Sequence, residues 1–180
     1  MRMQIIAIRH AATEYNEKEL INGTIDEPLS EKGLQQLPDL IDKLAEYGIS
    51  AVYASPLKRS VQTAEPIAEH YNLEVHIDAR LTEVDMGSFN GKPWSSTIPD
   101  FGLNSSGVLS SCEYDFEPFG GENADETRAR VQSFLDDLKA AGQDKPLVVC
   151  HGGILRWFYY LCTGQKAGRI PNSSVHIFEI

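Results

Sequence analysis

The chain has 180 residues, of which 42% are hydrophobic and 23% charged, and its formal net charge is −10 at pH 7. This length and hydrophobic content predict a single domain, residues 1–180, with one core. The negative charge argues against nucleic acid or an anionic membrane as the main partner, because both bind basic surfaces. No apolar run is long enough for a signal-peptide core or a membrane span, so we expect a cytoplasmic protein.

Alternating apolar runs and turn signals predict strands and helices in regular order. The predicted strands comprise residues 5–8, 51–54, 74–78, 146–150 and 174–180. The predicted helices comprise residues 30–47, 58–71, 123–141 and 152–161. Ser30 is the expected N-cap of the first helix, in which Pro38 predicts a kink or a delayed start. Asn123 and Glu126 predict a capping box. The alternation indicates an α/β fold built as a three-layer α/β/α sandwich.

Three of the predicted strands run directly into side chains that bind anions. The first strand leads into Arg9 and His10. The second leads into a Ser-Pro-Leu-Lys-Arg segment that ends at Arg59, and the fourth leads into His151 and Gly152. In an open α/β sheet, ligands bind beyond the carboxyl ends of the strands. The sequence therefore predicts two imidazoles and two guanidiniums around one anion.

These segments resemble the histidine phosphatase superfamily, also called phosphoglycerate-mutase-like. The opening signature of that family, Arg-His-Gly-x-Thr-x-x-Asn, reads RHAATEYN in residues 9–16. The resemblance continues in order through residues 22–33, 55–64, 81–87, 120–122 and 151–153. It implies a phosphoglycerate-mutase-like fold, no cofactor and a small phosphate ester as the partner. It also implies metal-independent hydrolysis of a phosphomonoester through a phosphohistidine intermediate.

The resemblance assigns a chemical role to five residues. His10 is the nucleophile that attacks phosphorus, and His151 donates a hydrogen bond to a phosphate oxygen from the opposite side. Arg9 and Arg59 hold the phosphate oxygens, because a guanidinium offers two parallel donors. Glu83 is the general acid that protonates the leaving oxygen, as an alkoxide departs poorly without a proton.

Four further residues are expected to bind the substrate or its phosphate. Asn16 matches the last position of the opening signature, and Asn22 and Gly23 match a loop that touches the substrate in the family. The amide of Gly152 opens a predicted helix and can donate to an anion. No metal ligands are predicted, because neither His-x-His nor His-Glu-x-x-His spacing occurs.

Residues 88–120 are rich in Ser, Gly and Pro and predict an irregular lid insertion that carries several aromatic side chains. A long loop in a small domain is usually functional or disordered, so it either faces the substrate or lies on the surface. Lys92 is the only basic residue between Arg80 and Arg128. An acidic, aromatic lid favours a neutral leaving group, which suggests the α-ribazole phosphatase or broad-specificity phosphatase branch over a phosphoglycerate mutase.

Three features leave alternatives open. Ala11 replaces the usual Gly beside the nucleophile and would be strained if the backbone there had a positive φ. The chain could therefore be a catalytically impaired phosphate-binding or regulatory relative. Asp85 competes with Glu83 as the acid. Cys150 adjoins His151 but reads as a small buried strand residue, and the odd number of cysteines fits reduced thiols. The physiological substrate and the oligomeric state are not predicted.

Overall fold

The computed structural model describes residues 3–99 and 103–180. Its main sheet has five strands in the order β3-β2-β6-β1-β7, and a second sheet pairs β4 with β5. The strands are β1 Gln4–Arg9, β2 Ala51–Ala54, β3 Val75–Ile77, β4 Thr97–Ile98, β5 Leu103–Asn104, β6 Pro146–Cys150 and β7 Val175–Glu179. The first four strands of the main sheet are parallel, and β7 runs antiparallel to β1 at the edge.

Helices cover both faces of this sheet. The α-helices are α1 Glu14–Glu17, α2 Glu31–Leu44, α3 Lys58–Tyr71, α4 Ser105–Ser111, α5 Ala124–Ala141 and α6 Gly152–Thr163. Short 3-10 helices are η1 Ala79–Leu81, η2 Gly87–Phe89 and η3 Glu117–Phe119. In the described part of the chain, no helix has the length and apolar character needed to cross a membrane.

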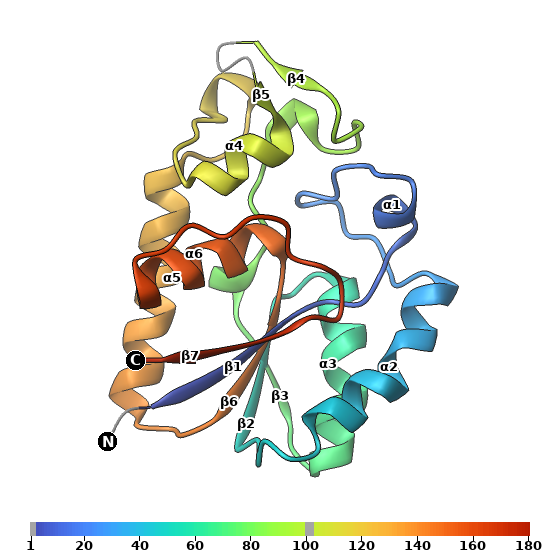
Figure 1. Ribbon diagram of the computed structural model, residues 1–180, viewed down its shortest axis with the longest axis vertical. Helices are drawn as coiled ribbons and strands as arrows, with labels where there is room; N and C mark the ends of the chain where they lie inside the picture. The colour runs from blue at the N-terminus through green and yellow to red at the C-terminus, as the bar shows by residue number, and fades with distance from the viewer. Residues whose placement is uncertain (1–2, 100–102) are drawn as a thin grey trace.

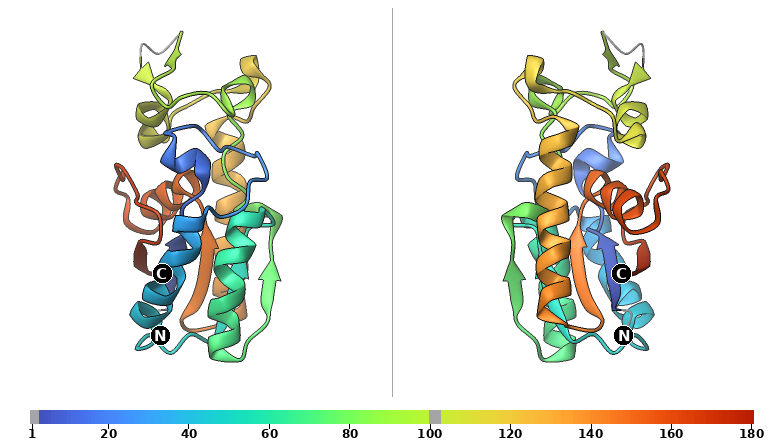
Figure 2. Two further views of the ribbon diagram at one scale, coloured as in Figure 1. Left: turned by 90° about the vertical axis from the view of Figure 1, so that its right-hand side faces the viewer. Right: turned by 90° about the vertical axis from the view of Figure 1, so that its left-hand side faces the viewer.

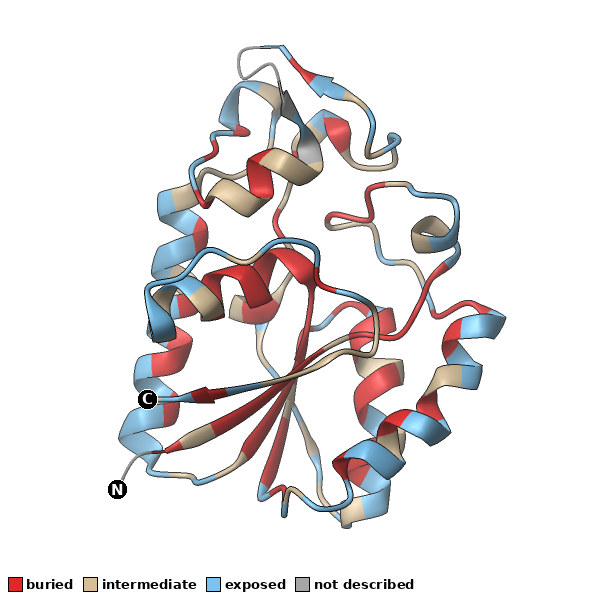
Figure 3. Cartoon of the chain, viewed as in Figure 1, coloured by how far each residue is buried: buried red, intermediate tan, exposed pale blue. Residues whose placement is uncertain are grey.

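Figures 1 and 2 show the main sheet between two helical layers, with α5 and α6 on one face and α2 and α3 on the other. Successive residues of β1 point to opposite layers: Ile5 and Ala7 join the core under α5 and α6, whereas Ile6 and Ile8 join the core under α2 and α3. Strands buried on both faces are apolar throughout rather than alternating. The predicted three-layer α/β/α sandwich is confirmed. Figure 3 shows the central strands β1, β2 and β6 buried along most of their length, whereas the edge strands β3 and β7 are mostly half-buried or exposed.

The strand register brings the two histidines of the predicted site together. Arg9 at the end of β1 pairs with Cys150 at the end of β6, so the next residues of both strands leave the sheet at the same level. The His10 amide donates to the Cys150 carbonyl at 3.0 Å. Neighbouring parallel strands therefore deliver His10 and His151 side by side at the carboxyl edge of the sheet.

The four predicted helices, α2, α3, α5 and α6, begin where the sequence predicts, and one of them ends early. Ser30 accepts the Gly33 amide as the N-cap of α2, and Asn123 forms the predicted capping box of α5. The start of α2 is not delayed, and the helix continues across Pro38. It ends at Leu44 rather than at residue 47. The Tyr71 hydroxyl donates a hydrogen bond to the Leu44 carbonyl at this end of the helix.

The lid segment has more secondary structure than the sequence indicates. The described part of residues 88–120 contains β4, β5, α4 and η3, and residues 100–102 lie outside the described residues. Asn104 caps α4 by accepting the Gly107 amide. Tyr114 and Phe116 are buried in the core cluster that includes α5 and α6. The second half of the lid is thus anchored by apolar packing, which an irregular composition does not reveal.

Candidate active site

His10 lies just beyond β1 and is only 2% exposed. Its Nδ1 atom is 2.7 Å from the Ala11 carbonyl oxygen. A carbonyl only accepts hydrogen bonds, so Nδ1 carries the proton and Nε2 keeps its lone pair. Burial, reinforced by Arg59 and Arg9, lowers the pKa of His10 well below its usual value of 6.5. The ring is therefore neutral at pH 7 and can act as a nucleophile through Nε2.

Ala11 fits its position without backbone strain. It is fully buried and is not among the described residues with positive φ. Its amide donates to Thr63 Oγ1 on α3 at 3.1 Å, and its carbonyl orients the His10 ring. The strain considered for Ala at this position is absent, and the Ala11 carbonyl still holds the His10 ring.

His151 faces His10 from the start of α6. The two ring centroids are 5.1 Å apart, and His151 Nε2 lies 2.7 Å from Ser55 Oγ at the end of β2. Burial, reinforced by the charges of Arg59 and Arg9, lowers the pKa of His151 well below its usual value. When Ser55 donates to Nε2, the proton of the neutral ring is on Nδ1. His151 then offers an Nδ1–H group to a ligand.

Two arginines, the half-buried Arg9 and the fully buried Arg59, flank the histidines. Arg9 donates through Nη1 to the Ile170 carbonyl at 2.6 Å. Arg59 donates to the carbonyls of Ile25 at 2.6 Å and Gly23 at 2.7 Å. Burial lowers the pKa of both Arg9 and Arg59 to about 10, so both stay charged at pH 7. These bonds hold each guanidinium through its terminal Nη atoms.

Three buried polar atoms of the described side chains have no hydrogen-bond partner, and all three belong to this cluster. They are Arg9 Nε, Arg59 Nε and His151 Nδ1. An unsatisfied buried donor costs about 1–3 kcal/mol, and the cost is larger for a charged group. A bound anion would satisfy all of them. The cluster therefore has the donors, the charge and the shape of an anion-binding site.

We call Arg9, His10, Arg59 and His151 the floor of this site, and Gly152 lies beside them. It begins α6, and the first amides of a helix have no partner within the helix. A Cβ atom at Gly152 would lie 3.7 Å from Arg9 Nε. A side chain would thus occupy the space in front of the unpartnered Arg9 nitrogen, and glycine leaves that space open.

Glu83 and Asp85 have different roles in the structure. Both carboxyl oxygens of Glu83 accept the Gly153 amide, at 3.1 and 3.2 Å, and Oε1 also accepts the Val84 amide at 2.9 Å. Glu83 lines a cavity that Arg9 and Gly152 also line. Asp85 instead closes a turn by accepting the amide of Gly87 at 2.9 Å. The geometry favours Glu83 over Asp85 as the acid of the site.

Gly153 is a functional position that the sequence analysis did not single out. A Cβ atom there would lie 2.5 Å from Glu83 Oε1 and 2.7 Å from Val84 Cγ2. Only glycine leaves room for the Glu83 carboxyl group over the start of α6. The second glycine of the His-Gly-Gly segment was the available signal.

A second feature missed from sequence is a brace around the Glu83 segment. Arg130 on α5 donates to the Arg80 and Thr82 carbonyls, both at 2.6 Å, and pairs with Glu122 at 2.7 Å. Glu122 in turn accepts the Asp85 amide at 3.0 Å. The segment is therefore held on both sides of Glu83, with Arg130 bonded before it and Glu122 after it.

The predicted substrate-binding residues divide into two groups. Asn16 lines the cavity and accepts the Asn172 side-chain amide at 2.9 Å. Asn22 lies behind it, because its amide nitrogen donates to Thr13 Oγ1 at 2.9 Å. Gly23 has a φ of +46° and supports Arg59 through its carbonyl. Asn22 and Gly23 thus build the wall of the site rather than its surface.

The cavity that Arg9, Gly152 and Glu83 line has a volume of about 300 Å³. The buried His10, Arg59 and His151 lie outside its lining. From the lid, Trp94 lines it, whereas Tyr114 and Phe116 are packed in the core. Arg156 on α6 and Arg169 in the segment before β7 also line it. Neither arginine was predicted, because both lie outside the family segments in the sequence.

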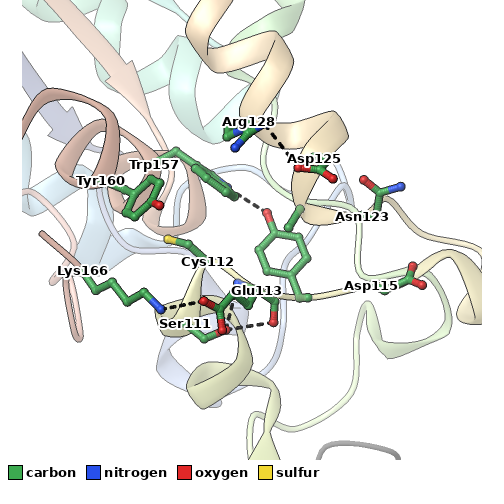
Figure 4. A pocket seen from close by; sticks show the side chains of 12 residues that line it. Ser111, Cys112, Glu113, Asp115, Asn123, Asp125, Arg128, Trp157, Tyr160 and Lys166 are labelled. Carbon is green, nitrogen blue, oxygen red and sulfur yellow. Dashed lines mark hydrogen bonds and ion pairs between the residues drawn. The ribbon is translucent and has the colours of Figure 1, made fainter. Parts of the chain in front are cut away.

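A second hollow of about 520 Å³ lies between α4, α5 and α6 (Figure 4). Trp157 Nε1 donates to the Tyr114 hydroxyl at 2.9 Å on its wall, and Lys166 pairs with Glu113 at 3.1 Å. None of the predicted site residues lines this hollow. Within residues 3–99 and 103–180, no group of three or more His, Cys, Asp or Glu side chains could hold a metal ion.

The fold and these side chains define an α/β protein with a candidate anion-binding site that holds two neutral histidines, and comparison with known proteins identifies its family. The model of the histidine phosphatase superfamily (branch 1) matches residues 5–180. The chain belongs to the histidine phosphatase superfamily, as the motifs indicate.

Named relatives cover most of the chain. It is 34% identical to a metal-independent phosphoserine phosphatase of Arabidopsis thaliana, over 98% of this chain and 76% of the relative. It is 33% identical to phosphoglycerate mutase-like protein 4 of the same organism, over 98% of this chain and 79% of that relative. The phosphoglycerate mutase structure from Bacillus anthracis str. Sterne superimposes with a TM-score of 0.86 at 20% identity, covering 99% of this chain and 88% of that one. That last match concerns the fold alone.

Proposed function

We propose that the protein hydrolyses phosphomonoesters of small metabolites without a metal ion, through a phosphohistidine formed on His10. The observation that supports this most strongly is the set of unpartnered buried donors on Arg9, Arg59 and His151 around the neutral His10 ring. These donors suit the oxygens of a transferring phosphoryl group, whose charge they stabilise.

In the first step, His10 Nε2 attacks phosphorus, and the bond between phosphorus and the ester oxygen breaks. Glu83 gives its proton to the departing oxygen, which leaves as an alcohol. Arg9, Arg59 and the His151 Nδ1–H group hold the three equatorial oxygens. In the second step, water attacks phosphorus, Glu83 takes a proton from that water, and the bond to Nε2 breaks to release phosphate and restore His10.

Two arguments bear on the substrate. The acidic lid composition suggested α-ribazole phosphate, whose neutral base would meet aromatic side chains. The structure places Trp94 in the cavity, which suits such a base, but it also places Arg156 and Arg169 there. A relative at 34% identity is named a metal-independent phosphoserine phosphatase. We therefore include phosphorylated acids and α-ribazole phosphate as competing substrates in one panel.

The test is phosphate release from a panel of phosphomonoesters in EDTA, with the wild type and His10→Ala compared. The panel includes α-ribazole phosphate, O-phosphoserine and 3-phosphoglycerate. We expect metal-independent turnover that disappears in His10→Ala. A wild type that hydrolyses no ester but binds phosphate would favour the regulatory alternative, and interconversion of 2- and 3-phosphoglycerate faster than phosphate release would favour a mutase.

A further inference from the structure

We propose that Asn172 is a positioning residue for the nucleophile, because its side-chain amide holds the backbone carbonyls that fix the His10 ring. Asn172 lies in the turn before β7, outside every motif segment identified in the sequence. The inference rests on the proposed function, since it concerns the residue that would carry the phosphoryl group. It adds to the site a group that neither binds the phosphate nor donates a proton to the ester.

The side-chain nitrogen of Asn172 contacts three oxygen atoms around the nucleophile. Nδ2 lies 3.0 Å from the His10 carbonyl oxygen, 3.4 Å from the Ala11 carbonyl oxygen and 2.9 Å from Asn16 Oδ1. The amide has two N–H groups, so one of them serves Asn16 and the two adjacent carbonyls share the other. The Ala11 carbonyl also accepts the His10 Nδ1–H group at 2.7 Å. Asn172 therefore holds the acceptor that sets the orientation and the tautomer of the ring.

The surrounding bonds allow only one orientation of the Asn172 amide. Carbonyl oxygens only accept hydrogen bonds, so Asn172 must present its nitrogen to them. Asn16 Oδ1 is also an acceptor, because the Thr13 amide donates to it at 3.2 Å and Asn16 Nδ2 donates to Asn22 Oδ1 at 2.9 Å. An aspartate at position 172 would have the same size and shape, but its ionised carboxylate has no N–H group. The position therefore requires an amide, and aspartate tests the two donors alone.

The turn that carries Asn172 has an uncommon backbone conformation beside the nucleophile. Ser173 has a φ of +56°, which is unfavourable for a residue other than glycine. In this conformation the Ser173 amide donates to the Arg9 carbonyl at 3.1 Å and lies 3.4 Å from the His10 carbonyl oxygen. Backbone strain of this kind persists where the surrounding structure fixes it, and it clusters at functional sites. The turn thus directs both the Ser173 amide and the Asn172 side chain toward the end of β1.

Contacts other than those of the Asn172 side chain keep this turn in place. Ile170, two residues earlier, is 3% exposed and belongs to the core cluster under α5 and α6. The Ile170 carbonyl accepts Arg9 Nη1 at 2.6 Å. The Ser174 hydroxyl donates to the Pro171 carbonyl at 2.6 Å. Removal of the Asn172 amide should therefore leave the fold and the phosphate-binding guanidinium in place and disturb the nucleophile.

The experiment compares Asn172→Ala and Asn172→Asp with the wild type and with the control Ser174→Ala. The control loosens the same turn, because it removes the bond to the Pro171 carbonyl, but it keeps the Asn172 amide. We would measure kcat for the best ester of the panel, the affinity for inorganic phosphate by calorimetry, and the melting temperature. The tautomer of His10 would be determined by NMR from the chemical shifts of its two ring nitrogens.

We expect both Asn172 variants to lower kcat about 10- to 100-fold, because a displaced nucleophile is no longer aligned with phosphorus. The affinity of Asn172→Ala for phosphate should stay within about threefold of the wild type, since binding and alignment are separate contributions. The His10 ring should carry its proton on Nδ1 in the wild type and in Ser174→Ala, and both tautomers should be present in Asn172→Ala. Ser174→Ala should keep kcat within about twofold of the wild type.

An unchanged kcat or an unchanged His10 tautomer in Asn172→Ala would overturn the positioning role and leave the phosphatase function standing. An equal loss of kcat in Ser174→Ala would also overturn it, because the turn as a whole would then be responsible. The charge of Asn172→Asp could unfold the protein, so Asn172→Ala decides the result. If the wild type hydrolyses no ester, the proposed function fails instead. The tautomer measurement needs no turnover and then tests Asn172 alone.

Discussion

The floor of the site and the rim of the cavity are built in different ways. The floor consists of His10, Arg59 and His151, which are buried, and of the half-buried Arg9. All four lie at the ends of adjacent parallel strands or at the helix starts that follow them. The rim is formed by segments far apart in the sequence, and Glu19 and Arg169 there are exposed. A rigid floor suits the common part of all phosphate esters, whereas a rim made of loops can change with the leaving group. Variants of the floor should therefore affect every substrate, and variants of the rim only some.

The largest effect is expected for Arg59→Lys. Lysine keeps the charge but loses the fork that bonds the Gly23 and Ile25 carbonyls and points Nε at the anion. We expect kcat/KM to fall about 100- to 1,000-fold for every ester of the panel. The matched control is Lys58→Gln, which removes an exposed cation next to it and should stay within about twofold. A substrate-dependent loss in Arg59→Lys would show that floor and rim are not separate.

The next effect concerns the general acid. Glu83→Gln removes the proton donor, and Gly153→Ala displaces the Glu83 carboxyl group because its Cβ would lie 2.5 Å from Oε1. Both should slow hydrolysis of alkyl phosphates about 100-fold. An activated aryl phosphate, whose phenolate departs without a proton, should be affected much less. Equal losses on alkyl and aryl esters would argue that Glu83 has another role.

A smaller effect is expected when the contacts of Arg130 that hold the Glu83 segment are removed. Arg130→Met removes the bonds to Glu122 and to the carbonyls before Glu83. It should lower alkyl phosphate turnover about tenfold and the free energy of unfolding by about 1–3 kcal/mol. Arg128→Met is the control, since Arg128 is exposed and pairs with Asp125 at 3.6 Å. Urea denaturation and kinetics on the same samples check both expectations. A stability loss with unchanged kinetics would make the brace purely structural.

The smallest effect is a dependence of stability on pH. Folding lowers the pKa of His10 and His151, so the unfolded chain binds more protons below pH 6.5. The free energy of unfolding should therefore fall as the pH drops below about 6.5, by about 1.4 kcal/mol per unit for each histidine. His10→Ala should reduce this slope, and His70→Ala, at an exposed position, should not. Urea titrations at pH 7, 6 and 5 in phosphate-free buffer measure it, and identical slopes in the three proteins would refute it.

The clustering of the floor residues could be predicted from the sequence, because each of them follows an apolar strand that can be recognised on its own. Two histidines and two arginines after apolar strands could be recognised one by one, and the strand register then placed them together. The rim was not predictable in the same way. Nothing in the sequence distinguishes Arg156 from the other residues of its helix. The position of Arg169 at the cavity depends on the path of the segment before β7, which the sequence does not indicate. Gly153 was missed because its role is steric and concerns a carboxyl group 70 positions away.

The lid shows the same limit. Its composition predicts a distinct insertion, but which aromatic side chains line the cavity depends on packing. Tyr114 and Phe116 are buried against α6, while Trp94 lines the cavity. Glu113 likewise pairs with Lys166, and Glu122 pairs with Arg130, both outside the cavity. Composition gives the net charge of a segment, but only the structure shows which groups its charged side chains contact.

The most direct test of the mechanism is to detect the phosphorylated enzyme during turnover. Wild type and His10→Ala would be mixed with a phosphoserine or phosphoglycerate substrate, quenched within milliseconds in alkali and analysed by mass spectrometry of the peptide that contains residue 10. We expect one acid-labile, alkali-stable phosphoryl group on His10 in the wild type and none in the variant. Turnover by the wild type with no phosphoryl group on His10, or with the group on another residue, would contradict the mechanism.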